Sequence, residues 1–291
     1  MAVRGKSINL FLMDGTASGR VKCTLANWTG LAYKIPRTDL EKCRNRADLK
    51  QSGVYFLFGV SDVTGDKMVY VGQAGTRKNG EGVLYRLQEH KRAMAEDYWT
   101  EAVVFTTSNH SFGPTEISYL ENRFFNLAVE ANRYQVRNNL DPTSGHTTEE
   151  KESELEEFID YAKIVMGTLG YPVFMPLEET VSIQEEKKTV VEPLLYLKGR
   201  QVDATGRRVP EGFIVYKDSI VRELATKSCP RHIQNLRKQY QDRLENQRLT
   251  ADTLFTSPSA AAGFVRYASM NGLTEWKDDK GRSLKEIENE E

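Results

Sequence analysis

Two short apolar runs separated by a polar turn constrain the fold of this chain most. Residues 53–60 are rich in β-branched and aromatic side chains, which favour strands. Residues 61–67 contain Asp, Thr and Gly, which are typical of a hairpin turn, and 68–72 are then the return strand. We therefore predict an antiparallel hairpin that brings Tyr55 and Tyr70 within reach of each other across the strands.

Helix and strand signals alternate after this hairpin. The glycine-rich stretch 75–82 is not a Walker phosphate loop, because Glu81-Gly82 stands where Lys and Ser/Thr are required. The order of elements predicts an α+β fold in which a small antiparallel sheet is flanked by helices. The expected elements are a helix over 82–96, a strand over 103–107, a helix from Pro114 to about Asn132, and a helical extension at 143–176 with its helix over 147–170.

Residues 1–49 predict an N-terminal hairpin and helix. Residues 7–13 alternate as a strand, Asp14-Gly15 is a turn signal, and 21–28 form the partner strand. Thr38 and Glu41 have the spacing of a capping box, which predicts a helix to about Leu49. We interpret this region as an extension packed on the next domain. The alternative is a DNA-contacting arm, although the region has no basic-aromatic cluster.

A second, small α+β domain is expected at 194–291, after a Glu/Lys-rich linker at 177–193. Its strands are predicted at 194–198 and 212–216, and Ser257-Pro258 has the residue types of a helix start. A helix over 230–244 is also expected. It carries a basic face formed by Arg231, Arg237, Lys238 and Arg243.

Composition sets limits on partners and compartment. The net charge of the 291 residues is −1, so any nucleic-acid contact must come from a local basic patch. Cys23, Cys43 and Cys229 form no CxxC pair, which fits a reducing compartment. Asp14 interrupts the only apolar run near the N-terminus, and no apolar stretch approaches the roughly 20 residues of a membrane span. We expect a soluble cytoplasmic protein with no membrane partner; the sequence indicates no oligomeric state.

Glu121 is the most informative charged residue. At helical spacing it falls within the apolar face that includes Ile117, Leu120 and Phe124. A carboxylate on a core-facing stripe is unfavourable unless it is paired, hydrogen-bonded or bound to a metal ion. The structural alternatives are an internal salt bridge to Arg86 or an edge residue that reaches solvent.

Arg86 and His90 are four residues apart and share one helix face beside an apolar stripe. The planar guanidinium of arginine suits phosphate oxygens, and histidine titrates near neutral pH. The alternative is an ordinary solvated helix face. Tyr55 and Tyr70, taken alone, are more typical of amphipathic core residues whose hydroxyl groups are hydrogen-bonded.

The ordered set of candidate residues consists of Gly53-Val54-Tyr55, Tyr70-Val71-Gly72, Arg86 with His90, Glu121 and Asn138. Taken in this order, these positions resemble the GIY-YIG nuclease family. Valine replaces isoleucine in both tripeptides and keeps the β-branching, and Asn139 is an alternative to Asn138. The resemblance covers residues 50–142 and implies a nuclease module of that family.

The resemblance implies a metal-dependent endonuclease that hydrolyses phosphodiester bonds in DNA. Glu121 would bind Mg²⁺ or Mn²⁺, and Arg86 would clamp the phosphate. Tyr55 would act as general base or position the water, with Tyr70 and His90 supporting proton transfer. A phenol with a pKa of about 10 needs such help near neutral pH. Asn138 would hold the Glu121 helix against the site.

The flanking regions resemble a bacterial GIY-YIG subgroup. The C-terminal part, with Gly212-Phe213, 256–262 and Glu275-Trp276, is similar to the RAMA domains of restriction-modification proteins. This implies DNA or modified-DNA binding and a role in restriction or anti-phage defence, by analogy alone. The competing hypothesis is a catalytically silent DNA-binding or adaptor protein that uses the module as a scaffold. A nucleotide-binding enzyme is disfavoured by the absent Walker motif.

Overall fold

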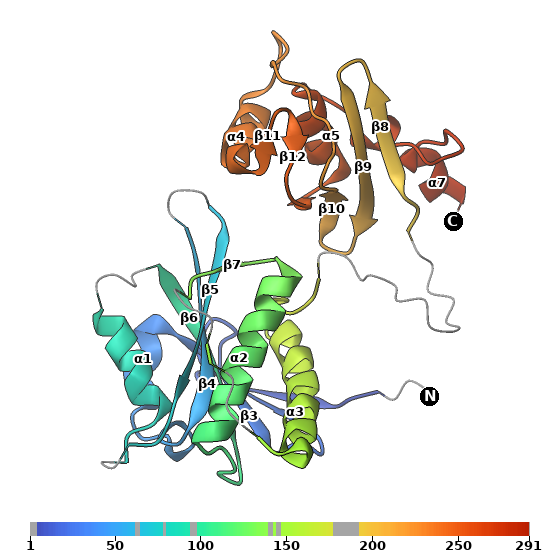
Figure 1. Cartoon of the computed structure of the whole chain (residues 1–291). Coiled ribbons are helices and arrows are strands. Elements are labelled where there is room, and N and C mark those ends of the chain that lie inside the picture. The colour runs from blue at the N-terminus through green and yellow to red at the C-terminus, as the bar shows by residue number, and fades with distance from the viewer. Residues whose placement is uncertain are drawn as a thin grey trace. The chain divides into compact units, whose positions relative to one another are not determined.

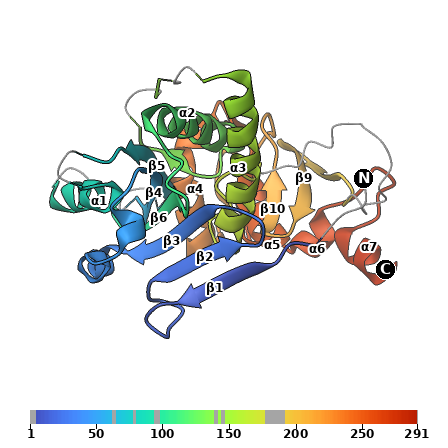
Figure 2. The ribbon, with the colours of Figure 1, turned by 90° about the horizontal axis from the view of Figure 1, so that it is seen from below.

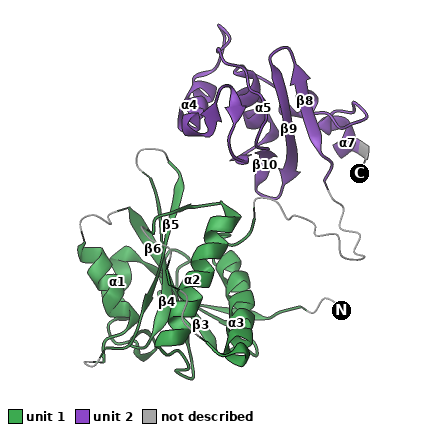
Figure 3. Ribbon diagram, viewed as in Figure 1, with its two compact units in different colours: residues 1–180 green, residues 181–291 purple. Residues whose placement is uncertain are grey.

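The computed structural model describes residues 5–61, 65–77, 80–93, 98–138, 142–143, 147–176 and 192–290. The chain divides into two compact units, residues 1–180 and 181–291 (Figure 3). The segments predicted at 1–49, 50–142 and 143–176 all fall in the first unit. Residues 177–191 of the predicted linker lie outside the described residues.

The first unit is built on one mixed sheet with helices on both faces (Figure 1). Its strands are β1 (Ile8–Leu12), β2 (Val21–Leu25), β3 (Gly30–Pro36), β4 (Gly53–Val60), β5 (Lys67–Ala74), β6 (Trp99–Thr107) and β7 (Gln135–Val136). Its helices are α1 (Val83–Arg92), α2 (Pro114–Ala131) and α3 (Glu149–Thr168), with 3-10 helices at Arg37–Cys43 and Ala47–Leu49.

The predicted hairpin is confirmed. β4 and β5 pair antiparallel, with Tyr55 opposite Gly72 and Leu57 opposite Tyr70. The sheet has seven strands in the order β1-β2-β3-β6-β4-β5-β7, and only the β5–β7 pair among them is parallel. The N-terminal hairpin, β1 with β2, continues into the unexpected strand β3, which pairs with β6 (Figure 2). The N-terminal region is therefore part of the sheet itself.

Each face of the sheet has its own hydrophobic core. Along β4, Val54 and Phe56 point into a core shared with α2 and α3. Tyr55 and Leu57 point into a core shared with α1 and the first 3-10 helix, on the opposite face. Figure 1 shows α1 on one side of the sheet and α2 with α3 on the other. Because side chains alternate along a strand, this arrangement places Tyr55 beneath the helix that carries Arg86 and His90.

The capping box predicted at Thr38 and Glu41 is wrong. The chain instead enters a 3-10 helix at Arg37, directly after Pro36, with no side-chain cap. A second short 3-10 turn follows at Ala47–Leu49 in place of a continuous helix. By contrast, Pro114 occupies the first turn of α2 as predicted, because proline lacks an N–H that this position would leave unsatisfied.

The second unit is a separate α+β domain, as expected. Its main sheet has the strand order β13-β10-β9-β8, and Phe213, Phe264 and Trp276 are fully buried in its core. Ser257 caps α5 by accepting a hydrogen bond from the Ala260 amide at 3.1 Å, as the Ser-Pro pair predicted. The elements are β8 (Leu195–Gly199), β9 (Val202–Val209), β10 (Gly212–Val215), β11 (Leu244–Glu245), β12 (Arg248–Leu249), β13 (Thr253–Phe255), α4 (Arg231–Gln239), α5 (Pro258–Arg266), α6 (Gly272–Glu275), α7 (Leu284–Glu290) and a 3-10 helix at Gln241–Arg243.

None of the helices in the described ranges is both long enough and apolar enough to cross a membrane.

Candidate active site

Tyr55, Tyr70 and His90 form a compact cluster on the α1 face of the sheet. The Tyr55 hydroxyl and His90 Nε2 are 2.7 Å apart, in a buried hydrogen bond. The His90 ring centroid lies 5.4 Å from that of Tyr55 and 5.3 Å from that of Tyr70, and the two tyrosine rings are 6.2 Å apart. Tyr55 and His90 are 1% and 3% exposed. The structure thus brings together one helical and two strand residues named from the sequence.

The two motif glycines are explained by close approaches. A Cβ on Gly72 would stand 2.4 Å from the Tyr55 hydroxyl oxygen, so the glycine leaves the space that the phenol fills. A Cβ on Gly53 would stand 2.6 Å from the Phe105 carbonyl oxygen of the neighbouring strand. Both distances are shorter than a carbon atom tolerates. Gly72 therefore leaves room for Tyr55, and Gly53 allows the close approach of β4 to β6.

Arg86 lies one helical turn before His90 and acts on the Tyr55 hydroxyl through its charge and a hydrogen bond. Its ion pair is with Glu89, at 2.9 Å from Arg86 Nη1 to Glu89 Oε2. Glu89 was missed in the sequence analysis, although its three-residue spacing from Arg86 is that of a helical ion pair. The salt bridge between Arg86 and Glu121 that was one structural alternative is not formed among the described ion pairs.

Glu121 is half-buried on α2 rather than fully core-facing. Burial raises the pKa of its carboxyl group, and hydrogen bonds from Gln73 and the charge of Arg86 oppose the rise. Gln73 also donates to Ser118 Oγ at 3.0 Å, which ties α2 to β5 one turn before Glu121. The Glu121 carboxylate reaches the tyrosine cluster electrostatically, since it contributes to raising the pKa of Tyr55.

The Tyr55 phenol is held in its neutral form. Burial is the main cause that raises its pKa above the usual range, and the neighbouring Tyr70 adds to the rise. Arg86 opposes it but does not reverse it. A phenol with so high a pKa can accept a proton from water only if it gives its own proton to another group. His90 Nε2 is within hydrogen-bond distance of the hydroxyl and can receive that proton.

Asn138 bonds to strand β5, whereas the resemblance implied that it holds the Glu121 helix. Its Nδ2 donates to the Val71 carbonyl at 2.7 Å, and its Oδ1 accepts from the Val71 amide at 3.0 Å. Asn138 follows β7, which pairs with β5 as far as Val136 and Val69, so its side-chain amide extends that pairing by two residues, to Val71. It holds the Tyr70–Gly72 strand, while Gln73 and Ser118 hold α2. Asn139, the alternative, lies outside the described residues.

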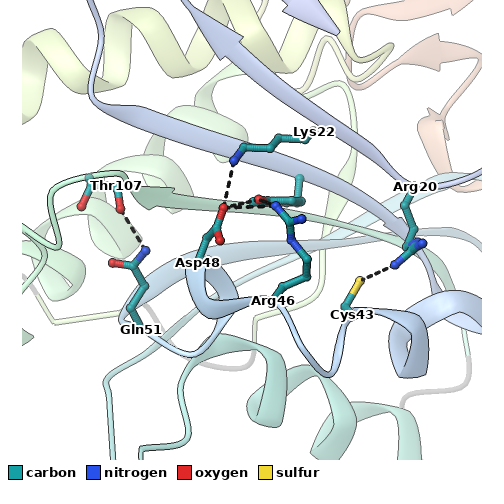
Figure 4. Close-up of polar contacts among 8 residues, drawn as sticks. Arg20, Lys22, Cys43, Arg46, Asp48, Gln51 and Thr107 are labelled. Atoms are coloured by element: carbon teal, nitrogen blue, oxygen red, sulfur yellow. Dashed lines mark hydrogen bonds and ion pairs between the residues drawn. The ribbon is translucent and has the colours of Figure 1, made fainter. Parts of the chain in front are cut away.

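A polar cluster missed in the sequence analysis anchors the N-terminal segment beside this site (Figure 4). Asp48 accepts hydrogen bonds from the Tyr33 hydroxyl, from Lys22 Nζ at 2.9 Å and from Arg46 Nη2 at 3.4 Å. Burial works to raise the pKa of Asp48, but the hydrogen bonds from Tyr33 and Lys22 lower it well below its usual range. The ionised carboxylate therefore fixes the short 3-10 turn at Ala47–Leu49 onto the sheet.

Gln51 connects this N-terminal segment to α1 through two hydrogen bonds. Its Nε2 donates to the Thr107 carbonyl at 2.9 Å, a contact drawn in Figure 4. Its own carbonyl accepts a hydrogen bond from the Val83 amide at 3.0 Å, at the first residue of α1. The N-terminal region thus positions the start of the helix that presents Arg86 and His90.

The donor set for a metal ion is sparse. In the described part of the chain, no group of three or more His, Cys, Asp or Glu side chains is placed to hold an ion. Glu121 is a single carboxylate whose desolvation would be relieved by a cation. This fits Mg²⁺ or Mn²⁺, which bind proteins through one or two carboxylates and keep waters or substrate phosphates as further ligands.

The basic helix of the second unit differs from its prediction. α4 ends at Gln239, and Arg237 is 7% exposed instead of facing solvent. Its guanidinium stacks on Phe264 and Tyr267, at 4.6 and 4.8 Å from the ring centroids, and donates to the Arg222 carbonyl. Arg231 and Lys238 remain exposed, so the basic face is smaller than expected.

Comparison with known proteins identifies one part of the chain. Residues 195–288 match the family described as Domain of unknown function (DUF4357). The match lies in the second unit and confirms an uncharacterised C-terminal domain; residues 50–142 are outside it, and the nuclease resemblance gains no support from it. No curated protein and no solved structure matches the chain.

Proposed function

We propose that the first unit is a metal-dependent endonuclease that hydrolyses phosphodiester bonds in DNA. The observation that carries the proposal is the buried hydrogen bond between the Tyr55 hydroxyl and His90 Nε2. The charges of Arg86 and Glu121 also shift the pKa of this phenol. A phenol, an imidazole, a guanidinium and a carboxylate from three separate elements supply the groups that phosphodiester hydrolysis needs.

In this proposal the proton moves along the Tyr55–His90 hydrogen bond. Tyr55 positions the attacking water and gives its hydroxyl proton to His90 Nε2 as it takes one from the water. This requires His90 to carry its own proton on Nδ1, which leaves Nε2 as acceptor. The raised pKa of Tyr55 favours this relay over a preformed phenolate.

Arg86 and Glu121 have complementary roles. Arg86 binds the non-bridging phosphate oxygens, which a guanidinium matches in geometry and charge. Glu121 holds Mg²⁺ or Mn²⁺, and the ion when bound offsets negative charge that develops on the phosphate. Tyr70 packs against His90 and keeps the imidazole beside Tyr55.

The second unit is proposed to bind DNA through the exposed part of α4, and the whole chain to act in restriction or anti-phage defence. These assignments rest on the similarity to RAMA domains and on the exposure of Arg231 and Lys238. The competing proposal is an adaptor that binds DNA without cutting it.

A plasmid-nicking assay with and without divalent ion tests the nuclease proposal. The protein should convert supercoiled plasmid to the open circle in Mg²⁺ or Mn²⁺ but not in EDTA. Tyr55→Phe should reduce the rate by about 100-fold or more, the usual contribution of a positioned proton-transfer group. Tyr119→Phe is the control, because Tyr119 is also buried and donates to Glu156 at 2.8 Å away from the tyrosine cluster.

DNA binding without divalent-dependent nicking would favour the adaptor. Equal nicking by the protein and by Tyr55→Phe would reject the proposed role of Tyr55.

A further inference from the structure

Two arginines converge on one carboxylate beside the candidate site. Arg77 Nη2 lies 2.9 Å from Glu89 Oε1 and 3.1 Å from Oε2. Arg86 Nη1 lies 2.9 Å from the same Oε2. Arg77 comes from the loop after β5 and also stacks on the Tyr85 ring, at 4.7 Å from the ring centroid. The three side chains form an Arg77–Glu89–Arg86 cluster that joins this loop to α1.

The geometry around Glu89 is that of an anion-binding site. Two guanidinium groups that share one oxygen atom repel each other unless an anion lies between them. A carboxylate and a phosphodiester both offer two oxygens with one negative charge, and both accept paired N–H groups from arginine. The same charges lower the pKa of Glu89, so the anion is present at neutral pH.

We propose that Arg77 and Arg86 form the binding site for one phosphodiester group of the nucleic acid, and that Glu89 occupies this site in the free protein. The identity of the ligand as a nucleic acid rests on the proposed function. The charge of Arg86 also opposes the rise in the pKa of the Tyr55 hydroxyl that burial causes, so a phosphate that replaced Glu89 would lie near the proton relay.

Exchange of the two anions is physically accessible. The Glu89 side chain is 29% exposed, and the Arg77 and Arg86 side chains are 46% and 41% exposed, so a backbone phosphate can reach them from solvent. Glu89 can turn outward on its flexible side chain while Arg77 stays stacked on Tyr85. When no phosphate is bound, the Glu89 carboxylate offsets the repulsion between the Arg77 and Arg86 guanidinium groups. It also competes with weakly bound anions for this site.

The test measures equilibrium binding of the full chain to a short DNA duplex in EDTA, by fluorescence anisotropy over a range of salt concentrations. Glu89→Gln should tighten binding by roughly 3- to 10-fold, because the competing charge is lost. Arg77→Gln should weaken binding and lower the salt slope by about one. Arg77→Lys should keep most of the slope but not the full affinity, because lysine lacks the planar fork.

Glu156→Gln is the matched control. It also removes one carboxylate that pairs with an arginine, Arg123, at 2.5 Å, but on the α2–α3 side of the unit. Equal effects of Glu89→Gln and Glu156→Gln, or no effect of Arg77→Gln, would overturn the proposal. Melting temperatures of all variants show that they remain folded.

The binding results separate this proposal from the nuclease proposal. If the protein nicks plasmid but Arg77→Gln binds as the wild type does, the site is wrong and the nuclease assignment stands. If the variants bind as expected but the protein never nicks, the phosphate site stands and the nuclease assignment fails.

Discussion

At the scale of single residues, the environment of Glu121 distinguishes a ligand-binding role of this carboxylate from a structural one. Burial raises its pKa above the value in the unfolded chain. A carboxyl group of this kind stabilises the fold when protonated, and this contribution is lost as the pH rises through the folded-state pKa. Once ionised, the half-buried carboxylate therefore opposes folding, as expected for a group whose role is to bind a ligand.

Glu121→Gln should for this reason leave the melting temperature at neutral pH unchanged or raise it. Glu156→Gln is again the comparison. The Arg123 guanidinium lowers the pKa of Glu156, so its stabilising effect is present above the unfolded pKa and is lost as the pH falls through the folded one. Its removal should lower stability by up to about 1 kcal/mol, as for other partly exposed pairs. A clear fall in melting temperature for Glu121→Gln would indicate a structural carboxylate.

Asn138 acts on the strand that carries Tyr70. Asn138→Ala removes both hydrogen bonds to Val71 and should reduce the free energy of unfolding by about 1–3 kcal/mol. Chemical denaturation measures this loss. Asn126→Ala is the control, because the Asn126 amide makes a single bond of 3.3 Å to Asn122 within one helix. Equal stability of the two variants would contradict the strand-clamping role.

At the scale of elements, local signals located the hairpin and the helix starts, because their causes lie within a few residues. Pro114 and Ser257 determine the first turns of α2 and α5 whatever surrounds them. The strand β3 was missed in the sequence analysis, although it pairs with its neighbour β2 as well as with β6, which lies far along the chain. The capping box at Thr38 failed because Pro36 and the packing of Leu40 favoured a 3-10 turn.

The basic face of α4 shows the same limit. Helical spacing grouped Arg237 with Arg231 and Lys238. Periodicity within one helix cannot reveal that the Arg237 guanidinium stacks on the rings of Phe264 and Tyr267. Burial lowers the pKa of Arg237 to about 10, so this arginine is a packing residue. The site residues were more predictable, because the hairpin and one helix turn sufficed to group Tyr55, Tyr70 and His90.

If the exposed part of α4 binds DNA, the double variant Arg231→Gln, Lys238→Gln should lower the salt slope of binding by about two. The control is Lys151→Gln, Lys163→Gln, which removes two cations from α3. Salt titrations that give the same slope for both double variants would leave the second unit without a role in phosphate contact.

At the scale of the whole molecule, the two units have separate hydrophobic cores. Residues 195–288 of the second unit match a domain family of unknown function, whereas the function proposed for the first unit rests on its own side chains. Their division was predictable from the charged stretch at 177–193, because few large apolar residues there can join either core.

The central claim is that the first unit cuts DNA with a divalent ion held by Glu121. The most direct measurement is the rate of plasmid nicking in Mg²⁺ for the wild type, Glu121→Gln and Glu156→Gln, with EDTA as a blank. We expect divalent-dependent nicking by the wild type and by Glu156→Gln, and its loss in Glu121→Gln at an undiminished melting temperature. Full nicking by Glu121→Gln in Mg²⁺ would contradict it.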